Sequence, residues 1–171
     1  MQKNKSISIS FSGIEAVLNQ LDTISQQVEI GANEGIRKAV ESTKELAIML
    51  APANDGQLRA NIKTNVNNLV GEIYVSIYDV PYVGYVYFGT GQYAKLNGKG
   101  KNSWFVPVSK VTKSVSKYGW QVHKGTNGME DFYIVKGQKA KPFLEQALEA
   151  NKLKNIDLLC EEVKIAIERS L

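Results

Sequence analysis

Apolar and polar residues alternate at the start of the chain and then change to helical spacing. Apolar side chains occupy every second position of residues 6–11, which predicts a short strand. Residues 12–15, Ser-Gly-Ile-Glu, have the form of a capping box at a helix start. Apolar residues then recur every three or four positions up to Leu50, interrupted by Gly31 and Gly35. We expect one long helix or two, with the glycines marking either a break or a groove that another element approaches.

The middle of the chain has the two-residue period of strands. Residues 58–66 and 73–78 each place apolar side chains on alternate positions, and the turn residues Asn67 and Asn68 lie between them. These two segments predict an antiparallel hairpin. Three further short strands are predicted at residues 104–108, 118–122 and 132–135.

The C-terminal part predicts a helix with one break. Pro142 suits the first helical turn, where the N–H that proline lacks is not needed. An apolar stripe begins at Phe143 and continues to Ile167 after a break near residues 151–155. The order of elements predicts an α+β fold, a mainly antiparallel sheet packed by a long N-terminal helix and a C-terminal helix, with a long basic loop. A length of 171 residues fits a single domain.

Composition is that of a globular protein, with 43% hydrophobic and 22% charged residues. No run of 18 apolar residues occurs, so we expect no membrane partner. The first residues lack the pattern of a secretion signal, and we expect a protein made and kept in a cytoplasm.

The net charge of +4 is unevenly distributed. No aspartate or glutamate occurs between Val80 and Met129, which predicts a basic face within an extended loop and hairpin region at residues 92–130. The lysines of this region lie near Tyr93 and Trp104 in the sequence. This composition is typical of a loop that contacts a phosphate backbone without reading the base sequence, or of one that contacts an acidic protein neighbour. The lysines of the stretch are Lys95, Lys99, Lys101, Lys110, Lys113, Lys117 and Lys124.

The segment with the strongest signal is residues 81–91, Pro-Tyr-Val-Gly-Tyr-Val-Tyr-Phe-Gly-Thr-Gly. Its aromatic and β-branched residues predict an extended segment that ends in a glycine turn. The glycines lack the spacing of nucleotide-binding loops, and no strong helix pattern follows Gly91. An aromatic patch held by a rigid turn is instead a favourable anchor for a protein interface.

Candidate chemistry is sparse. Cys160 is the single cysteine and His123 the single histidine, so we expect no disulfide, no metal site and no cofactor. A hydrolase that uses His123 with Cys160 or Ser116 is one hypothesis, but Cys160 falls on an apolar stripe where cysteine is usually a small buried hydrophobe. We predict no catalytic residue.

Two motifs resemble those of a tail-component family of tailed bacteriophages, the tail-completion or head-tail joining proteins. Residues 82–91 resemble its Y-x-x-Y-V-E-F-G-T-G motif, and residues 141–147, Lys-Pro-Phe-Leu-Glu-Gln-Ala, resemble its P-F-L-x-P-A motif. The opening strand and helix, the helix end at Pro52 and the Gly-x-Leu-Arg segment at residues 56–59 extend the resemblance over nearly the whole chain. The chain departs from the family at Tyr87, where glutamate is common, at Gln146, where proline is common, and in a long segment from Gln92 to Gln138.

The resemblance implies a non-enzymatic virion protein of the neck of a phage or related prophage, assembled in the bacterial cytoplasm. It would form a homo-oligomeric ring, hexameric by resemblance, around the DNA channel, between the head connector or stopper protein and the tail terminator or tail tube protein. The alternatives are a stand-alone basic nucleic-acid-binding protein and a small enzyme with His123 as general base. The residues assigned to the fold or the ring contact are Tyr82, Tyr85, Tyr87, Phe88, Pro142, Phe143 and Leu144, those assigned to the turn are Gly89, Thr90 and Gly91, and those assigned to channel DNA or an adjacent ring are Lys95, Lys99 and Lys101.

Overall fold

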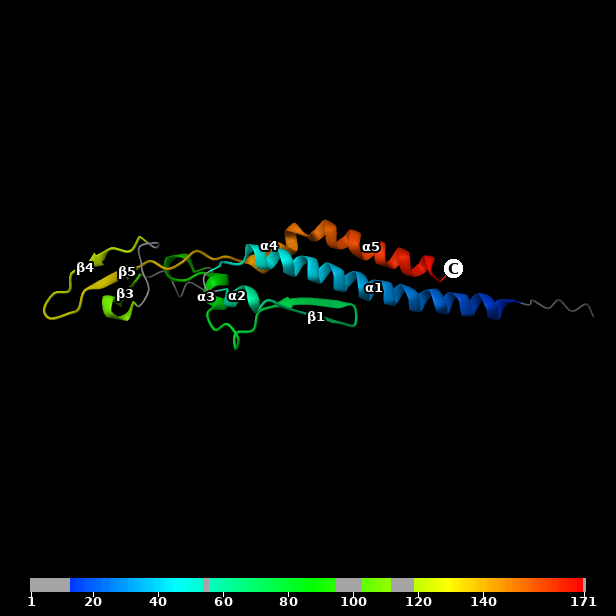
Figure 1. Cartoon of the computed structure of the whole chain (residues 1–171), viewed down its shortest axis with the longest axis horizontal. Helices are drawn as coiled ribbons and strands as arrows, with labels where there is room; N and C mark the ends of the chain where they lie inside the picture. Colours follow the sequence, from blue (N-terminus) through cyan, green and yellow to red (C-terminus); the bar gives the residue numbers. More distant parts are fainter. Residues whose placement is uncertain (1–12, 54–55, 95–102, 112–118, 171) are drawn as a thin grey trace, which may run out of the picture. The chain divides into compact units, whose positions relative to one another are not determined.

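A computed structural model describes residues 13–53, 56–94, 103–111 and 119–170 (Figure 1). The chain divides into two compact units. Unit 1 comprises Met1–Thr43, Thr64–Glu72 and Asn151–Leu171, and unit 2 comprises Lys44–Lys63 and Ile73–Ala150. The elements in chain order are α1 (Ile14–Leu50), α2 (Gln57–Ala60), β1 (Lys63–Asn67), β2 (Val70–Tyr74), α3 (Val83–Phe88), the 3-10 helix η1 (Gly91–Tyr93), β3 (Trp104–Pro107), the 3-10 helix η2 (Val108–Lys110), β4 (Val122–His123), β5 (Phe132–Val135), α4 (Phe143–Ala150) and α5 (Lys152–Glu168).

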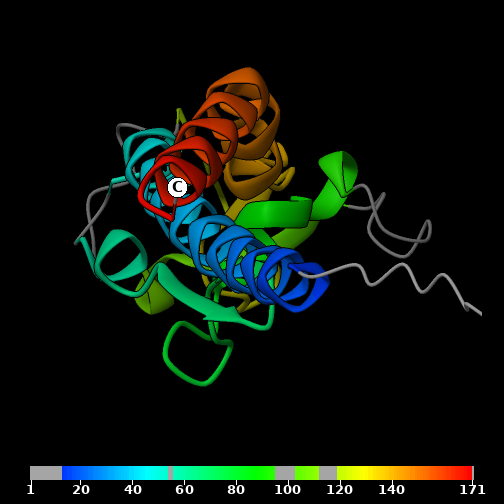
Figure 2. The ribbon, with the colours of Figure 1, turned by 90° about the vertical axis from the view of Figure 1, so that its right-hand side faces the viewer.

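In unit 1, α5 lies beside α1 at the two glycines of α1 (Figure 2). A Cβ atom at Gly31 would lie 2.7 Å from Cβ of Ala166, and one at Gly35 would lie 2.7 Å from Cα of Leu159. Both values are below the closest approach of real Cβ atoms, so each glycine lets the backbones approach. The N-terminal helix is therefore a single helix, and its glycines form a groove for another helix rather than a break.

Polar side chains fix the register between α1 and α5. Thr43 is 1% exposed and donates its hydroxyl to the Ala39 carbonyl at 2.8 Å. The amide nitrogen of Asn155 donates in turn to Thr43 Oγ1 at 2.9 Å. Lys38 and Glu162 form an ion pair between the helices. A buried hydroxyl that is satisfied across the interface disfavours other registers, because shifting either helix would leave it without a partner.

The hairpin of β1 and β2 closes through a two-residue turn at Asn68 and Leu69, whose φ angles are 46° and 62°. Positive φ at both turn positions matches the twist of the flanking strands. The amide of Leu69 donates to Asn33 Oδ1 of α1 at 3.2 Å. At Gly71 a Cβ atom would collide with Val40 of α1, so the glycine allows close packing of the hairpin on the helix.

The predicted hairpin is confirmed, but its strand boundaries were wrong. The first strand begins at Lys63, because residues 57–60 form the helix α2. There the Arg59 guanidinium donates to the carbonyls of Ala51 at 2.8 Å and Met49 at 3.2 Å, which have no partner within a helix that ends at Leu50. The second strand ends at Tyr74 instead of Tyr78.

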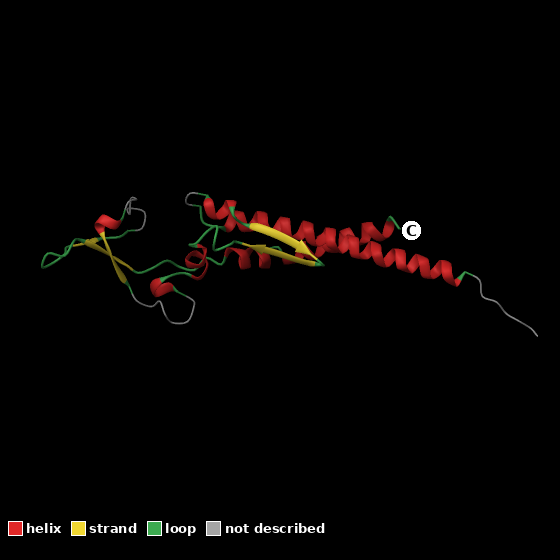
Figure 3. Ribbon diagram, turned by 90° about the horizontal axis from the view of Figure 1, so that it is seen from below, coloured by secondary structure: helices red, strands yellow, loops and turns green. Residues whose placement is uncertain are grey.

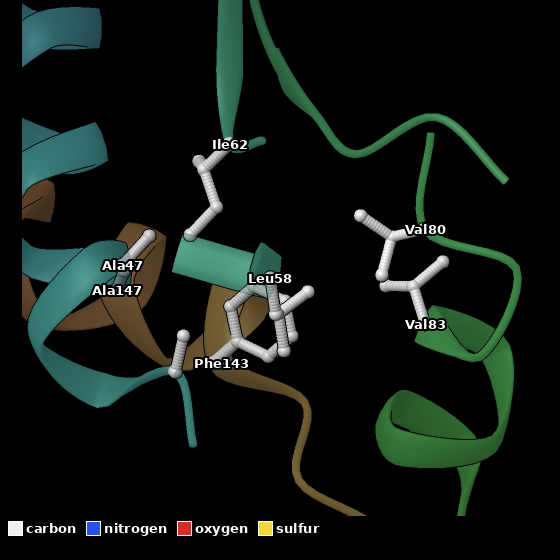
Figure 4. Packing of buried hydrophobic residues seen from close by; sticks show 8 residues of the cluster. Ala47, Leu58, Ile62, Val80, Val83, Phe143 and Ala147 are labelled. Carbon is white, nitrogen blue, oxygen red and sulfur yellow. The ribbon is translucent and has the colours of Figure 1, made fainter. Parts of the chain in front are cut away.

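Unit 2 contains the main hydrophobic core, which gathers α2, α4 and the last turn of α1 around one aromatic ring. Phe143 is fully buried, and its ring lies beside Leu58 (Figure 4). Ala47 and Ala147 are fully buried members of the same core, contributed by α1 and α4. The buried members of the core are Ala47, Ala51, Leu58, Ile62, Val80, Val83, Phe143 and Ala147.

The second sheet, also in unit 2, has the strand order β3-β5-β4. Its strands are among those drawn in yellow in Figure 3. Both pairings are antiparallel, with Trp104 opposite Val135 and His123 opposite Phe132. Phe105 contacts Phe132 edge to face at 5.0 Å between ring centroids. The predicted strands at residues 104–108 and 132–135 are confirmed, whereas the bounds predicted for the strand at residues 118–122 were wrong, because β4 comprises only Val122–His123.

The predicted α+β class is confirmed, with a long N-terminal helix, a C-terminal helix and antiparallel sheets. The strands form two small sheets instead of one. The C-terminal helix breaks at Asn151, as predicted. The strand predicted at residues 6–11 lies outside the described residues, and the single-domain expectation stays a prediction. Within the described ranges no helix is long and apolar enough to cross a membrane.

Candidate interaction site

The aromatic segment is helical, so the prediction of an extended segment was wrong. Residues 83–88 form α3. Val83 is buried, and Val86 and Tyr87 pack against the core of unit 2, which is helical spacing of three and four residues. The amide of Val86 donates to the Tyr82 carbonyl at 3.2 Å. Burial of this stripe overrides the preference of valine and tyrosine for strands.

Two glycines end α3 where a second chain segment crosses it. Gly89 has φ 77° and ψ 174°, a conformation that is essentially restricted to glycine. A Cβ atom at Gly89 would lie 2.8 Å from the Ala140 nitrogen and 2.8 Å from the Tyr93 oxygen. Gly91 has φ 58°, and a Cβ atom there would collide with the Lys136 carbonyl. The glycines therefore let residues 89–91 pass directly beside residues 136–140.

Backbone and side-chain hydrogen bonds join these segments. The amide of Thr90 donates to the Gln138 carbonyl at 3.0 Å, and the amide of Gln138 donates to Thr90 Oγ1 at 3.0 Å. The Gln138 side chain donates to the Tyr85 carbonyl at 2.8 Å, and the amide of Lys141 donates to the Val86 carbonyl at 3.0 Å. Both last acceptors lie in the final turn of α3, whose carbonyls have no partner within the helix. We name this arrangement of residues 82–91 with residues 136–144 the aromatic-glycine junction.

The second motif completes the junction. Phe143 begins α4 and contacts Tyr87 edge to face, with 5.8 Å between ring centroids. Leu144 packs on the same core, and Pro142 lies directly before the helix instead of in its first turn, where it was predicted. The amide of Gln146 donates to the Pro142 carbonyl at 3.0 Å, a bond that proline at this position could not make.

Tyr87 serves as a packing residue rather than a surface group. Burial raises the pKa of its phenol above the ordinary value of 10.0, and the negative charge of Glu145 acts in the same direction. A hydrogen bond from the Glu145 backbone opposes the rise. The phenol lies beside the rings of Phe143 and Phe88. Glutamate there would place a charge against two aromatic rings, so Tyr87 suits this core.

Some of the predicted site residues pack inside the junction and support the fold, and others are exposed at its surface. Tyr85 is 65% exposed and Phe88 is 40% exposed, one turn apart on α3. Aromatic side chains on a short helix that is tied down at its end form a pre-organised surface. The remaining site residues of the two motifs, which are buried or partly buried, are Tyr82, Tyr87, Gly89, Thr90, Gly91, Pro142, Phe143 and Leu144.

The lysines assigned to channel DNA, Lys95, Lys99 and Lys101, lie outside the described residues. In the described part of the basic region, Lys124 pairs with Asp131 at 2.9 Å. The Asp131 carboxylate also accepts from the Gly125 amide at 3.1 Å, and Glu130 accepts from the Ser109 amide at 2.7 Å. Glu130 and Asp131, the acids that directly follow the acid-free stretch, therefore stabilise turns within that stretch.

We expect the Asp131 carboxylate to stabilise the turn at pH values above the ordinary pKa of this group. The hydrogen bond from Lys124, followed by that from the Gly125 amide, holds the pKa of Asp131 below 3.8. Its contribution to stability is therefore present above pH 3.8 and lost as the pH falls through the lower folded-state pKa. In Lys124→Met the carboxyl should titrate closer to 3.8, which NMR titration of the Asp131 carboxyl carbon measures. The same titration curve in both proteins would contradict this.

Of the residues in the enzyme hypothesis, His123 and Cys160 are described, whereas Ser116 lies outside the described residues. His123 stacks on Phe132, with 5.8 Å between centroids. It lines a cleft of about 590 Å³ with Tyr93, Trp120 and Lys136. Cys160 is exposed on α5, so the expectation of a buried cysteine was wrong. No group of three or more histidine, cysteine or acidic residues that could hold a metal occurs in the portion of the chain described above.

Sequence reasoning missed Gln138. It makes three of the bonds that hold the junction together. A single polar residue between Gly137 and Lys139 carries no pattern that distinguishes it from a solvent-exposed loop residue. The only available signal was Gly137, since a glycine before a helix start can indicate a close backbone approach.

Comparison of the chain with protein-family models, with curated protein sequences and with solved structures finds no match.

Proposed function

We propose that the chain is a non-enzymatic structural protein of the bacteriophage neck, which joins the head connector to the tail tube as part of a ring around the DNA channel. The observation that supports this is the aromatic-glycine junction. The two motifs on which the family resemblance rests lie fifty residues apart in sequence, but the hydrogen bond from the Lys141 amide to the Val86 carbonyl and the ring contact of Phe143 with Tyr87 join them. The buried side chains of the junction pack in the core of unit 2, and its exposed side chains are aromatic.

The exposed pair Tyr85 and Phe88 has the properties of an interface anchor. Aromatic side chains dominate the binding energy of protein interfaces when they enter a pocket on the partner. The bonds from Gln138 and Lys141 to the last turn of α3 hold the pair in place before binding, which lowers the entropy lost on association. Such a surface suits a fixed neighbour in a virion, either a second subunit, the connector or stopper protein, or the tail terminator or tail tube protein.

Replacing Tyr85 with alanine should weaken this contact about tenfold or more, the effect of losing an aromatic anchor. Its side chain is exposed, so the melting temperature of the purified protein should change little. The measurement is complementation of particles that lack this chain, scored as the fraction of heads joined to tails. Tyr78→Ala is the matched control, because Tyr78 is 91% exposed and lies outside the junction.

If Tyr85→Ala joins heads to tails as well as the wild type does, the α3 surface is not the contact. If Tyr78→Ala fails equally, the loss is not specific to the junction. A loss confined to Tyr85→Ala supports the assignment of the exposed aromatic pair.

A second candidate function is non-specific nucleic-acid binding. The cleft that Tyr93, Trp120, His123 and Lys136 line combines aromatic rings with basic groups, and its described lining residues include no acid. Affinity for single-stranded DNA should then fall steeply with salt, because each phosphate contact releases counterions. Lys136→Gln should reduce the salt slope by about one. Undetectable binding at about 50 mM salt would exclude this function.

A further inference from the structure

Unit 1 has an apolar stripe on the first half of α1 that no described residue covers. Large apolar side chains gathered on one helix face indicate a contact surface, unlike exposed residues that are scattered. Ile24 and Val28 belong to the stripe at the three- and four-residue spacing of one face. The other members, each 55–59% exposed, are Ile14, Val17, Leu18 and Leu21.

The stripe ends where α5 begins to cover α1. Gly31 of α1 lies against Ala166, and α5 ends two residues later at Glu168. The α1 surface is therefore occupied from Gly31 onward and open before it. The open part, from Ile14 to Val28, spans fourteen residue steps, about 21 Å at 1.5 Å per residue.

The charges beside the stripe are all negative. Glu15, Asp22 and Glu29 follow one another at seven-residue spacing, so they form one row along the helix. All three are exposed, and none forms an ion pair with another residue of the described ranges. No lysine or arginine occurs on α1 before Arg37. A segment that is apolar on one face and basic suits this surface.

Residues 5–11 of the same chain, Lys-Ser-Ile-Ser-Ile-Ser-Phe, have this chemistry, and we name them the N-terminal segment. They lie outside the described residues. In an extended backbone successive side chains point to opposite faces. The three apolar residues would then share one face with Lys5, and the three serines would share the other. Residues 1–12 contain two lysines and no acid.

We propose that the N-terminal segment binds the stripe of its own chain, extended and antiparallel to α1. The lengths agree, because six extended steps at 3.3 Å per residue span about 20 Å, against about 21 Å for the stripe. Two extended residues advance about as far as four or five helical residues. With Phe11 at the first turn of α1, Ile9 therefore lies level with Leu21.

Charge selects this occupant over the helices of a second copy. The same register places Lys5 level with Glu29, the last acid of the row. The stripe of a second copy carries the same row of acids, and α5 carries four acids against three lysines, so either would bring like charges together. The observations behind this contact lie in unit 1, and those behind the neck proposal lie in unit 2, so either can fail without the other.

The connection to α1 favours a contact within one chain. Only Ser12 and Gly13 separate the N-terminal segment from α1. Gly13 has φ 100°, a conformation that glycine adopts without strain, so the chain can reverse its direction there. A short connection also keeps the segment at high effective concentration beside its own stripe.

Disulfide trapping tests the contact in the full chain with Cys160→Ser, which removes the only native thiol. Ile9→Cys with Leu21→Cys should form an intramolecular disulfide on mild oxidation, seen as a faster-migrating monomer on a non-reducing gel. Ile9→Cys with Asn19→Cys is the matched control, because Asn19 is exposed and within one turn of Leu21 but lies on the opposite face. The first pair should link about tenfold faster, the ratio for a segment that is bound roughly 90% of the time.

Equal linking rates for the two pairs would show that the segment does not prefer the stripe, and would overturn the proposal. Disulfide-linked dimers from the first pair, in place of linked monomers, would show that the segment binds a second copy, and would overturn it as well.

Thiol labelling gives a second readout that leaves the N-terminal segment intact. In the Leu21→Cys, Cys160→Ser protein, the introduced thiol should react with a maleimide about tenfold more slowly than when the apolar residues of the segment are also replaced. These replacements are Ile7→Ser, Ile9→Ser and Phe11→Ser. The same replacements should leave the labelling of an Asn19→Cys, Cys160→Ser protein unchanged. If they also leave the labelling at position 21 unchanged, the segment does not cover the stripe and the proposal is overturned.

Discussion

Replacing Phe143 with alanine should lower the free energy of unfolding by about 3–5 kcal/mol, the range observed for removing a buried aromatic ring. The ring is fully buried and packs on Tyr87 at 5.8 Å between centroids. It is also the largest side chain in the core that holds α2, α3 and α4 of unit 2 together. The cavity would lie between separate elements, so no single side chain can move to fill it.

Urea unfolding of the wild type and Phe143→Ala measures this loss. Leu148→Ala is the matched control, because Leu148 lies on the same helix but is 58% exposed, and its removal should cost less than about 1 kcal/mol. Equal losses for the two variants would show that Phe143 is not central to the core.

The second large effect is expected for Gly89→Ala, with a loss of about 3 kcal/mol in the free energy of unfolding. The φ of 77° with ψ of 174° is strained for any side chain. In addition, the new methyl group would lie within 3.0 Å of backbone atoms of Ala140, Tyr93 and Gln138. Backbone atoms cannot rotate away as a flexible side chain can, so the two segments of the junction would have to separate.

Gly84→Ala is the control for Gly89→Ala. Gly84 lies inside α3, and a Cβ atom there would meet nothing within 4 Å in the described part of the chain. Alanine is favoured over glycine in a helix by up to about 1 kcal/mol, so this variant should be neutral or more stable. A Gly89→Ala protein as stable as Gly84→Ala would contradict the geometry of the junction.

Elements with long, regular patterns were predictable from the sequence. The helical spacing from Ile14 to Leu50 gave α1, and the alternative in which Gly31 and Gly35 form a groove is the observed one. The strands β3 and β5 followed from short aromatic and β-branched runs. In these cases local preference and tertiary packing favour the same structure.

Two errors came from packing that overrides local preference. Residues 82–88 combine strand-forming residue types with a buried stripe at helical spacing, and the core of unit 2 selects the helix. Residues 58–62 alternate as a strand does, but Leu58 is buried in the core and Arg59 binds the carbonyls that end α1. The core around Leu58 and the carbonyls that Arg59 binds come from residues that are not adjacent in sequence, so alternation alone could not reveal these contacts.

The candidate site was predicted in its parts but not in its arrangement. The motifs containing Gly89 and Phe143 were visible in the sequence, but their joining through Thr90 and Gln138 depends on contacts across forty-eight residues. The exposed stripe of α1 was also visible, as an amphipathic pattern. Only the structure shows that α5 covers the second half of the α1 face and not the first.

Electron microscopy of particles from the genome that encodes this chain, with its gene intact and deleted, most directly tests the central claim. We predict that without the chain filled heads and complete tails form separately and fail to join, and that supplying the wild-type chain restores joined particles. Normally joined particles in the absence of the chain would contradict a role in the neck.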